Sequence, residues 1–305
     1  MEFFKKTTHI NFMALRKWTA LISLLLFIAS LSSLLIYGLN WGLDFTGGAQ
    51  LQIQYAQPVN LENIRVQLDQ ANLKQAIVQS YGTAKDILIT LPPDKVLSTE
   101  SLIHKILTAL PGANLQRQDM IGPDVGAELA NKGALAFVIA LLGMMIYIGL
   151  RFEWRFAVSA AIALIHDPVL ILGIFSFYHI EFNLTALAAV LAVIGYSLND
   201  TIVIYDRVRE NFRKFRKLNS LEVMNLSINQ TLSRTIMTSA ATLVVVMMLF
   251  VFGGQMIHNF SLALIIGIVV GTYSSIYVAG ALAIALGLSR QDLMPQKTAA
   301  VDDLP

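Results

Sequence analysis

Six apolar stretches, each long enough to cross the roughly 30 Å hydrocarbon core of a bilayer, decide what this chain can fold into. Apolar residues make up 55% of the 305 residues and charged residues only 14%. A soluble domain carries about 45–50% apolar and about 25% charged residues. We therefore expect a polytopic α-helical membrane protein. Its transmembrane helices are predicted at residues 18–37 and, within 132–288, at 133–150, 157–178, 184–205, 235–252 and 260–288.

The basic residues predict which side of the membrane each connection faces. Lys and Arg occur in the leader 1–17, in the connection 207–233 and in the tail 289–305, whereas the turns 178–183 and 253–259 contain neither. Positively charged connections stay in the cytoplasm, so we expect both termini there. The first apolar stretch exceeds the about 7–15 apolar residues of a signal peptide and lacks a cleavage site, which favours an uncleaved helix.

Residues 38–131 have the composition of a soluble domain and fall between the first two crossings, which predicts a periplasmic domain. Alternating and helical apolar periodicities give the order strand, helix, strand, strand, helix, strand. That order is the ferredoxin-like pattern of a small α+β domain. The expected elements are strands at 51–55, 76–80, 86–91 and 114–121 and helices at 61–71 and 98–110.

A glycine-containing segment, Gly-Leu-Asp-Phe-Thr-Gly-Gly at 42–48, lies where the chain leaves the bilayer. Glycine permits backbone angles that are closed to other residues, so a tight turn into the following strand is expected. A role in partner contact or signal transmission is the alternative. The residues singled out are Gly42, Asp44, Phe45, Gly47 and Gly48.

Asp200 is the most unusual residue, because it lies inside the fourth apolar stretch, directly after Gly195, Tyr196 and Asn199. An ionised Asp at mid-membrane costs on the order of 2.5–3.5 kcal/mol, and such residues usually face a bundle interior or a water-filled path. Either neighbouring polar groups hold Asp200 permanently, or it gains and loses a proton during a transport cycle.

Three further ionisable residues lie in or near the membrane: Arg234, His166 and Asp167. Arg234 begins the fifth crossing, and its long side chain could meet Asp200 at a similar depth. A carboxylate beside a guanidinium stays ionised and can be protonated once the guanidinium leaves, which would make a switch. His166 and Asp167 have either a structural hydrogen-bonding role or a part in a proton path.

Four motifs together resemble the bacterial SecD/SecF family of protein-export membrane proteins, which is related to the resistance-nodulation-division transporters. They are the 42–48 segment, His166-Asp167, Gly195 to Asp200 running into Asp206-Arg207, and Gln-Thr-Leu-Ser-Arg-Thr at 230–235. The resemblance implies a six-helix inner-membrane subunit that works with SecD, the SecYEG channel and other accessory membrane proteins of the translocase. It also implies use of the proton motive force to move preproteins, with Asp200 and Arg234 associated with proton passage.

Other functions remain open: a passive scaffold for translocon assembly, or half of a small-molecule or lipid exporter. No catalytic set, metal-ligand spacing, cofactor motif or nucleotide-binding loop is present, and cysteine is absent, so we expect neither an enzyme nor a cofactor. The basic residues lie beside membrane segments, where they suit anionic lipid rather than nucleic acid. The connection 211–233 docks either on the membrane surface or on another subunit.

Overall fold

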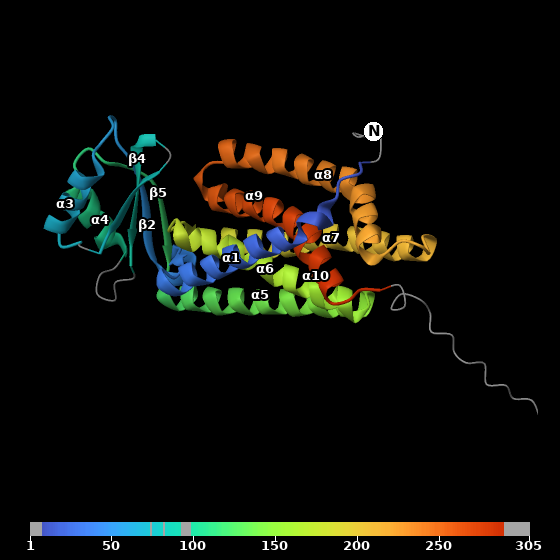
Figure 1. The fold of residues 1–305 in the computed structure, drawn as a ribbon. Helices are drawn as coiled ribbons and strands as arrows, with labels where there is room; N and C mark the ends of the chain where they lie inside the picture. The colour runs from blue at the N-terminus through green and yellow to red at the C-terminus, as the bar shows by residue number, and fades with distance from the viewer. Residues whose placement is uncertain (1–7, 74, 82, 93–98, 290–305) are drawn as a thin grey trace, which may run out of the picture.

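A computed structural model describes residues 8–73, 75–81, 83–92 and 99–289. Lys5, Lys6 and the tail from residue 290 lie outside the described residues. Within them, six helices are long and apolar enough to cross a membrane, which confirms the predicted class. Figure 1 shows these helices side by side, with the α+β domain beyond one end of the bundle. The crossings are α1 (Arg16–Ile36), α5 (Pro123–Arg151), α6 (Trp154–Phe177), α7 (Leu184–Lys214), α8 (Ser220–Phe252) and α9 (His258–Tyr273), the last continued by a π-helix, η3 (Ser274–Ala279), and α10 (Gly280–Ala285).

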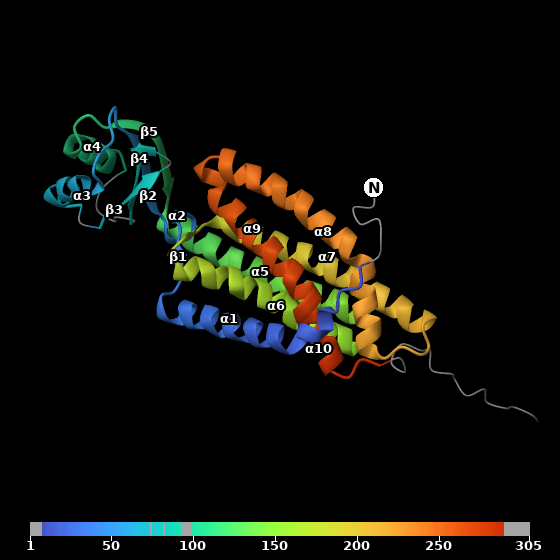
Figure 2. The same cartoon turned by 45° about the horizontal axis from the view of Figure 1, so that its top comes forward.

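The small domain has the predicted ferredoxin-like element order. Its antiparallel sheet has the strand order β3-β4-β2-β5, with helices α3 (Leu61–Gln70) and α4 (Thr99–Ala109) packed on one face (Figure 2). The strands are β2 (Gly48–Gln54), β3 (Ile77–Tyr81), β4 (Thr83–Leu91) and β5 (Asn114–Ile121). Alternate strand residues such as Leu51, Ile53, Ile87 and Ile89 are buried against the helices and form a core separate from that of the bundle.

Helix α7 lies at the centre of the bundle, and glycines on α9 let the two helices approach closely. A Cβ on Gly267 would lie 2.2 Å from a Val193 methyl group, and one on Gly271 would lie 2.9 Å from the Ser197 Cβ. Small residues at such spacing allow transmembrane helices to pack backbone to backbone. The Gly267-x-x-x-Gly271 motif of α9 is therefore a helix-packing motif against α7.

The connection between the fourth and fifth crossings is more helical than expected. Helix α7 continues to Lys214, and α8 begins at Ser220 rather than near residue 235. A capping box formed by Asn219 and Glu222 starts α8, because each side chain accepts a hydrogen bond from the other residue's backbone N–H. The turns that follow bury the apolar side chains Val223, Met224 and Ile228 in the bundle core.

The N-terminal segment packs on this first part of α8. Asn229 Oδ1 accepts from the Ile10 backbone N–H at 2.9 Å, and Asn225 Oδ1 accepts from that of Met13 at 2.9 Å. Met13 itself is buried in the core. The connection 211–233 thus packs against the chain's own N-terminal segment, an arrangement that the sequence left undecided.

Candidate functional site

Asp167 on α6 is the best satisfied carboxylate in the interior of the bundle. Its side chain is 1% exposed. Its Oδ2 accepts hydrogen bonds from Ser197 Oγ on α7 and from Ser274 Oγ on η3, the latter at 2.8 Å. Its Oδ1 lies 3.0 Å from Nδ1 of His166. A buried carboxylate is tolerated when hydrogen bonds replace its water, so this cluster holds α6, α7 and η3 together.

The π-helix η3 supplies two of the hydroxyl groups around this cluster. Ser275 Oγ accepts from Thr201 Oγ1 at 2.9 Å, while Ser274 reaches Asp167. Short π-helical turns occur frequently at functional sites because they re-aim side chains within a helix. Sequence analysis missed Ser197, Thr201, Ser274 and Ser275. Their signal was the i, i+4 spacing of Ser197 and Thr201, which puts both hydroxyls on one helix face.

Asp200 differs from Asp167 in its hydrogen bonding. It lies one helical turn after Ser197, is 4% exposed, and its Oδ2 is buried without a hydrogen-bond partner among the described residues. The charge of Arg234 acts on Asp200 through space. Arg234 is itself exposed, and no ion pair joins the two residues in the described part of the chain. Asp200 is therefore a buried carboxyl group with an unused oxygen and a cation within electrostatic range.

The other residues of the Asp200 motif have separate positions. Tyr196 Oη donates to Ser239 Oγ on α8 at 3.4 Å, and Ser239 is joined to Thr272 on α9 at 2.8 Å. Asn199 is exposed on the surface of α7 and does not join the buried cluster. Gly195 makes no close helix contact, because a Cβ there would meet only the Met144 methyl group at 3.8 Å.

The 42–48 segment forms the junction between the bundle and the α+β domain. Gly42 caps a one-turn helix, α2 (Leu43–Thr46), and Gly47 and Gly48 then lead into β2 with φ angles of +68° and +123°. A Cβ on Gly47 would lie 2.8 Å from Pro123 Cα, and one on Gly48 would lie 2.1 Å from the Leu91 carbonyl oxygen. Both positions need glycine for its positive φ and for close packing.

Asp44 joins this junction to the helix that carries Asp200. Its Oδ2 accepts from the backbone N–H of Leu184, the first residue of α7, at 2.8 Å. A carboxylate at a helix N-terminus satisfies an unpaired N–H and interacts favourably with the helix dipole. Phe45 is buried beside Phe182 in the same junction, with the two rings stacked at 6.0 Å.

The short strand β1 (Asn40–Trp41) pairs in parallel with β6 (Glu181–Phe182), which precedes α7. Burial raises the pKa of the Glu181 carboxyl group, and the nearby charge of Asp44 raises it further. A Cβ on Gly42 would lie 2.8 Å from Glu181 Oε1, so glycine there leaves room for this carboxyl group. The junction thus brings two acidic groups together at the end of α7 that lies nearest the α+β domain.

At the opposite end of α7, Asp206 and Arg207 tie the helix to its neighbours. Asp206 Oδ2 accepts from Arg151 Nη2 at the end of α5, at 2.7 Å. Arg207 Nε donates to Gln230 Oε1 on α8 at 2.7 Å. Both contacts are partly solvent-exposed, so they orient the helix ends and add little to stability.

Comparison with known proteins identifies the family. A family model described as "Protein export membrane protein SecD/SecF, C-terminal" matches residues 103–289, and one described as "SecD/SecF GG Motif" matches residues 32–59. The chain belongs to the SecD/SecF family. The GG motif of this family corresponds to the junction described above, and the C-terminal model covers the helices that carry Asp167, Asp200 and Arg234.

Members of the SecD/SecF family with curated descriptions match along the whole chain. "Protein translocase subunit SecF" of Vibrio alginolyticus is 45% identical and covers 100% of this chain and 99% of its own length. The protein of the same description from Pseudomonas aeruginosa is 46% identical, over 98% of this chain and 99% of its own length.

Two solved structures share the fold. The crystal structure of SecDF, described as a translocon-associated membrane protein, from Thermus thermophilus is 35% identical, with a TM-score of 0.84 over 92% of this chain. SecDF in a "Super-membrane-facing form" is also 35% identical, with a TM-score of 0.70 over 93% of this chain. In both cases this chain spans 39% of the SecDF chain.

Proposed function

We propose that this chain is the SecF subunit of a SecD/SecF complex that promotes preprotein translocation through the SecYEG channel of the bacterial inner membrane. The similarity to proteins described as protein translocase subunit SecF extends over almost the entire length of both chains. This chain matches 39% of each SecDF chain, and we propose that SecD is the partner that corresponds to the rest.

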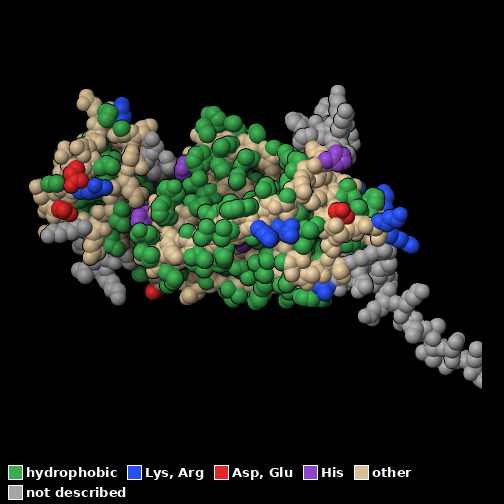
Figure 3. Space-filling view, in the orientation of Figure 1, with side chains coloured by type: hydrophobic (Ala, Val, Ile, Leu, Met, Phe, Trp, Pro, Cys, Tyr) green, Lys and Arg blue, Asp and Glu red, His purple; other side chains and the backbone are tan. Residues whose placement is uncertain are grey.

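We propose further that both termini face the cytoplasm. Lys and Arg of the bundle lie mostly at the end away from the α+β domain, as Figure 3 shows, and such residues remain on the cytoplasmic side. The α+β domain would then face the periplasm.

The proton motive force would act through Asp200 and Arg234. The observation that carries this proposal is the buried Oδ2 of Asp200, which lacks a partner among the described residues while Arg234 lies within electrostatic range. Moving one charge through the membrane potential yields about 2.3 kcal/mol per 100 mV, enough to shift a two-state equilibrium. His166 and Asp167 would hold the neighbouring helices, since their cluster already satisfies the Asp167 carboxylate.

Coupling to the external domain would run along α7. Asp44 binds the first residue of that helix, and Asp200 lies in its middle. The two SecDF structures match this chain at equal identity with TM-scores of 0.84 and 0.70. The two SecDF structures therefore do not share one overall arrangement, as coupling through a conformational change would require.

The test is preprotein translocation into inverted membrane vesicles that contain this chain with its SecD partner, with and without a proton gradient. We expect Asp200→Asn to remove the gradient-dependent part of translocation while the complex still assembles. The matched control is Glu210→Gln on the same helix, an exposed residue paired with Arg207, which should leave the gradient effect intact. Unchanged translocation with Asp200→Asn would favour the passive scaffold.

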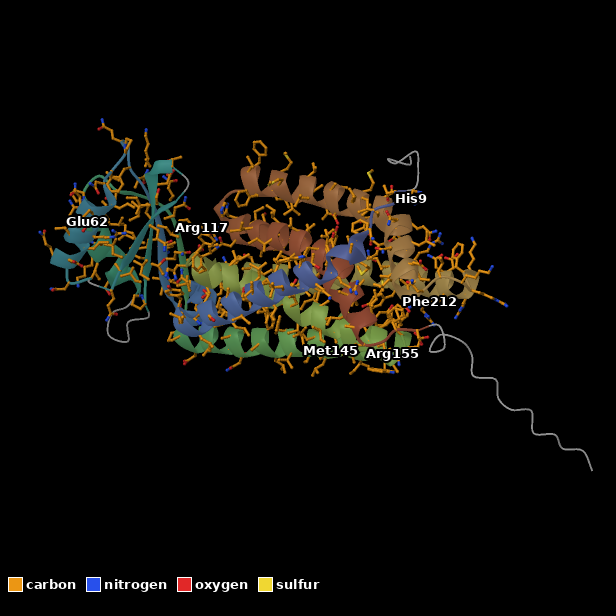
Figure 4. The ribbon with its side chains drawn as sticks, in the orientation of Figure 1. His9, Glu62, Arg117, Met145, Arg155 and Phe212 are labelled. Carbon is orange, nitrogen blue, oxygen red and sulfur yellow. The ribbon has the colours of Figure 1, made fainter. Side chains whose placement is uncertain are left out.

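The coupling is tested by tying the domain to the bundle. Arg117 on β5 lies on the side of the domain that faces the bundle (Figure 4), and its Nη1 contacts Met256 Sδ at 2.6 Å in the turn before α9. Because the chain has no cysteine, Arg117→Cys/Met256→Cys can be joined by a short bismaleimide. We expect the cross-link to abolish stimulation of translocation, and each single variant treated alike to retain it. Full stimulation after complete cross-linking would remove the proposed coupling.

A further inference from the structure

A cleft of about 750 Å³ opens between α1, α6 and the η3–α10 segment. Its walls are almost entirely apolar and include Leu24, Phe27, Ile162, Ile165 and Leu282. The volume falls in the range of about 300–1,000 Å³ that is typical of small-molecule sites. The cleft is thus a defined space on the outside of the bundle.

Two basic residues, Arg16 and Lys17, line the end of the cleft that lies away from the α+β domain. Neither is paired with a carboxylate within the described ranges 8–73, 75–81, 83–92 and 99–289. Among the described residues, Arg16 Nη1 donates only to the Met13 carbonyl oxygen, at 3.1 Å. The adjacent Trp18 is 68% exposed, as is common for Trp at the level of lipid headgroups. In Figure 3 basic side chains stand out on this otherwise apolar face.

The length of the cleft matches one leaflet of a bilayer. Ten residues of α1 separate Lys17 from Phe27, which is about 15 Å along a helix. One leaflet contributes about half of the roughly 30 Å hydrocarbon core. A molecule with an anionic group at Arg16 and Lys17 and a hydrocarbon chain reaching Phe27 would therefore fill the cleft.

The deep end of the cleft is bordered by His166. The Phe27 ring stacks on the His166 ring at 6.2 Å, and both side chains line the cleft. Nε2 of His166 is buried and has no hydrogen-bond partner among the described residues. A hydrocarbon chain in the cleft would separate this nitrogen, and the Asp167 cluster behind it, from water entering at the basic end.

A helix of a partner protein fits the cleft less well than a lipid chain does. A helical segment about 15 Å long and about 10 Å across occupies roughly 1,200 Å³, more than the cleft offers. Such a helix would also need acidic side chains at the end beside Arg16 and Lys17 and apolar side chains along the rest of the cleft. An acyl chain below a phosphate meets both requirements.

We propose that this cleft binds one anionic phospholipid, with the phosphate on Arg16 and Lys17 and one acyl chain between α1 and α6. Basic pockets between transmembrane helices on the cytoplasmic side bind such headgroups. The bound acyl chain fills the cleft from the basic end to His166 and shields that side chain from water. This site is independent of the Asp200 and Arg234 pair.

The proposal is tested by titrating the purified full chain with phosphatidylglycerol or phosphatidylcholine and counting bound lipid by native mass spectrometry. We expect one phosphatidylglycerol to bind at least about tenfold more tightly than phosphatidylcholine. Arg16→Gln/Lys17→Gln should lower that affinity about thirtyfold, since each basic residue near the surface contributes on the order of 1 kcal/mol. The matched control is Arg213→Gln/Lys214→Gln, an exposed basic pair on α7, which should leave it unchanged.

A second variant tests the acyl-chain part of the site. Ala20 is exposed and lines the cleft one turn from Arg16, so Ala20→Phe adds bulk to the cleft without displacing a core residue. It should weaken phosphatidylglycerol binding although both charges remain. Equal affinity for the two lipids, an equal loss in the control pair, or unchanged binding with Ala20→Phe would each overturn the proposal.

Discussion

Replacing Gly48 with alanine tests why the junction between the bundle and the α+β domain needs glycine. At a φ of +123° a side chain costs about 1–3 kcal/mol in backbone strain. The added Cβ would also lie 2.1 Å from the Leu91 carbonyl oxygen, whereas real Cβ atoms essentially never approach closer than 3.0 Å. Strands β2 and β4 pair at Ala49 and Leu91. The two strands must therefore move about 0.9 Å apart beside this pair to make room for the Cβ.

Such a separation weakens one or two ladder hydrogen bonds, each of which contributes about 1 kcal/mol net. Gly112 provides the matched control, because its φ is +81° and a Cβ there would meet nothing within 4 Å. Gly112→Ala therefore introduces the backbone strain of a positive φ without a steric contact. We expect Gly48→Ala to destabilise the β2–β4 pairing by about 2 kcal/mol more than Gly112→Ala, which is roughly a thirtyfold larger open population.

The assay is hydrogen exchange with mass spectrometry on the full chain in detergent, comparing peptides of β2 and β4 with peptides of α7. Exchange should accelerate in the two strands and stay unchanged in α7, since the domain has its own core. If β2 exchanges within threefold of the Gly112→Ala rate, steric contact with Leu91 does not explain the need for glycine at position 48.

Three further predictions concern the acidic residues of the junction and the bundle. Asp44→Asn should weaken the cap on α7 by about 0.5–1 kcal/mol, because the negative charge beside the Leu184 N–H is lost. Amide hydrogen exchange in the first turn of α7 should then become faster, and an unchanged exchange rate would contradict the capping role. The raised pKa of Glu181 means that the folded junction binds this proton more tightly than the unfolded chain does, so its stabilising effect is complete below the unfolded pKa and is lost as pH rises through the folded pKa. Protection factors at the junction should fall over that window, and Glu181→Gln should flatten the dependence. Asp167→Asn should lower the free energy of unfolding by about 1–3 kcal/mol, because it replaces a carboxylate whose oxygens accept hydrogen bonds. Asp200→Asn should not lower it, since the Asp200 Oδ2 has no partner among the described residues. Thermal unfolding in detergent measures both losses, and equal losses would contradict this difference between the two carboxyl groups.

Much of the fold followed from short-range patterns. The six apolar stretches and the ferredoxin-like order of residues 38–131 could be predicted because helix and strand periodicities are local properties. The start of α8 could not, because the polar appearance of 211–233 conceals a buried face formed by Val223, Met224 and Ile228. That face is stabilised only when the N-terminal segment, more than 200 residues earlier in the chain, packs against it.

The same division applies to the candidate site. An ionisable residue in an apolar run is conspicuous, so the sequence alone singled out Asp200, Asp167, His166 and the glycines of the junction. Which carboxylate is satisfied and which has a free oxygen depends on hydroxyl groups from other helices, and serine and threonine are too common in membrane helices to be recognised in advance. Composition and periodicity thus determined the class, the crossings and the residues that cost energy in a membrane. Only tertiary structure decided that Ser197 and Ser274 compensate Asp167, and that Asp44 reaches across 140 residues to cap the helix carrying Asp200, because hydrogen bonds between distant segments exist only once the helices have packed.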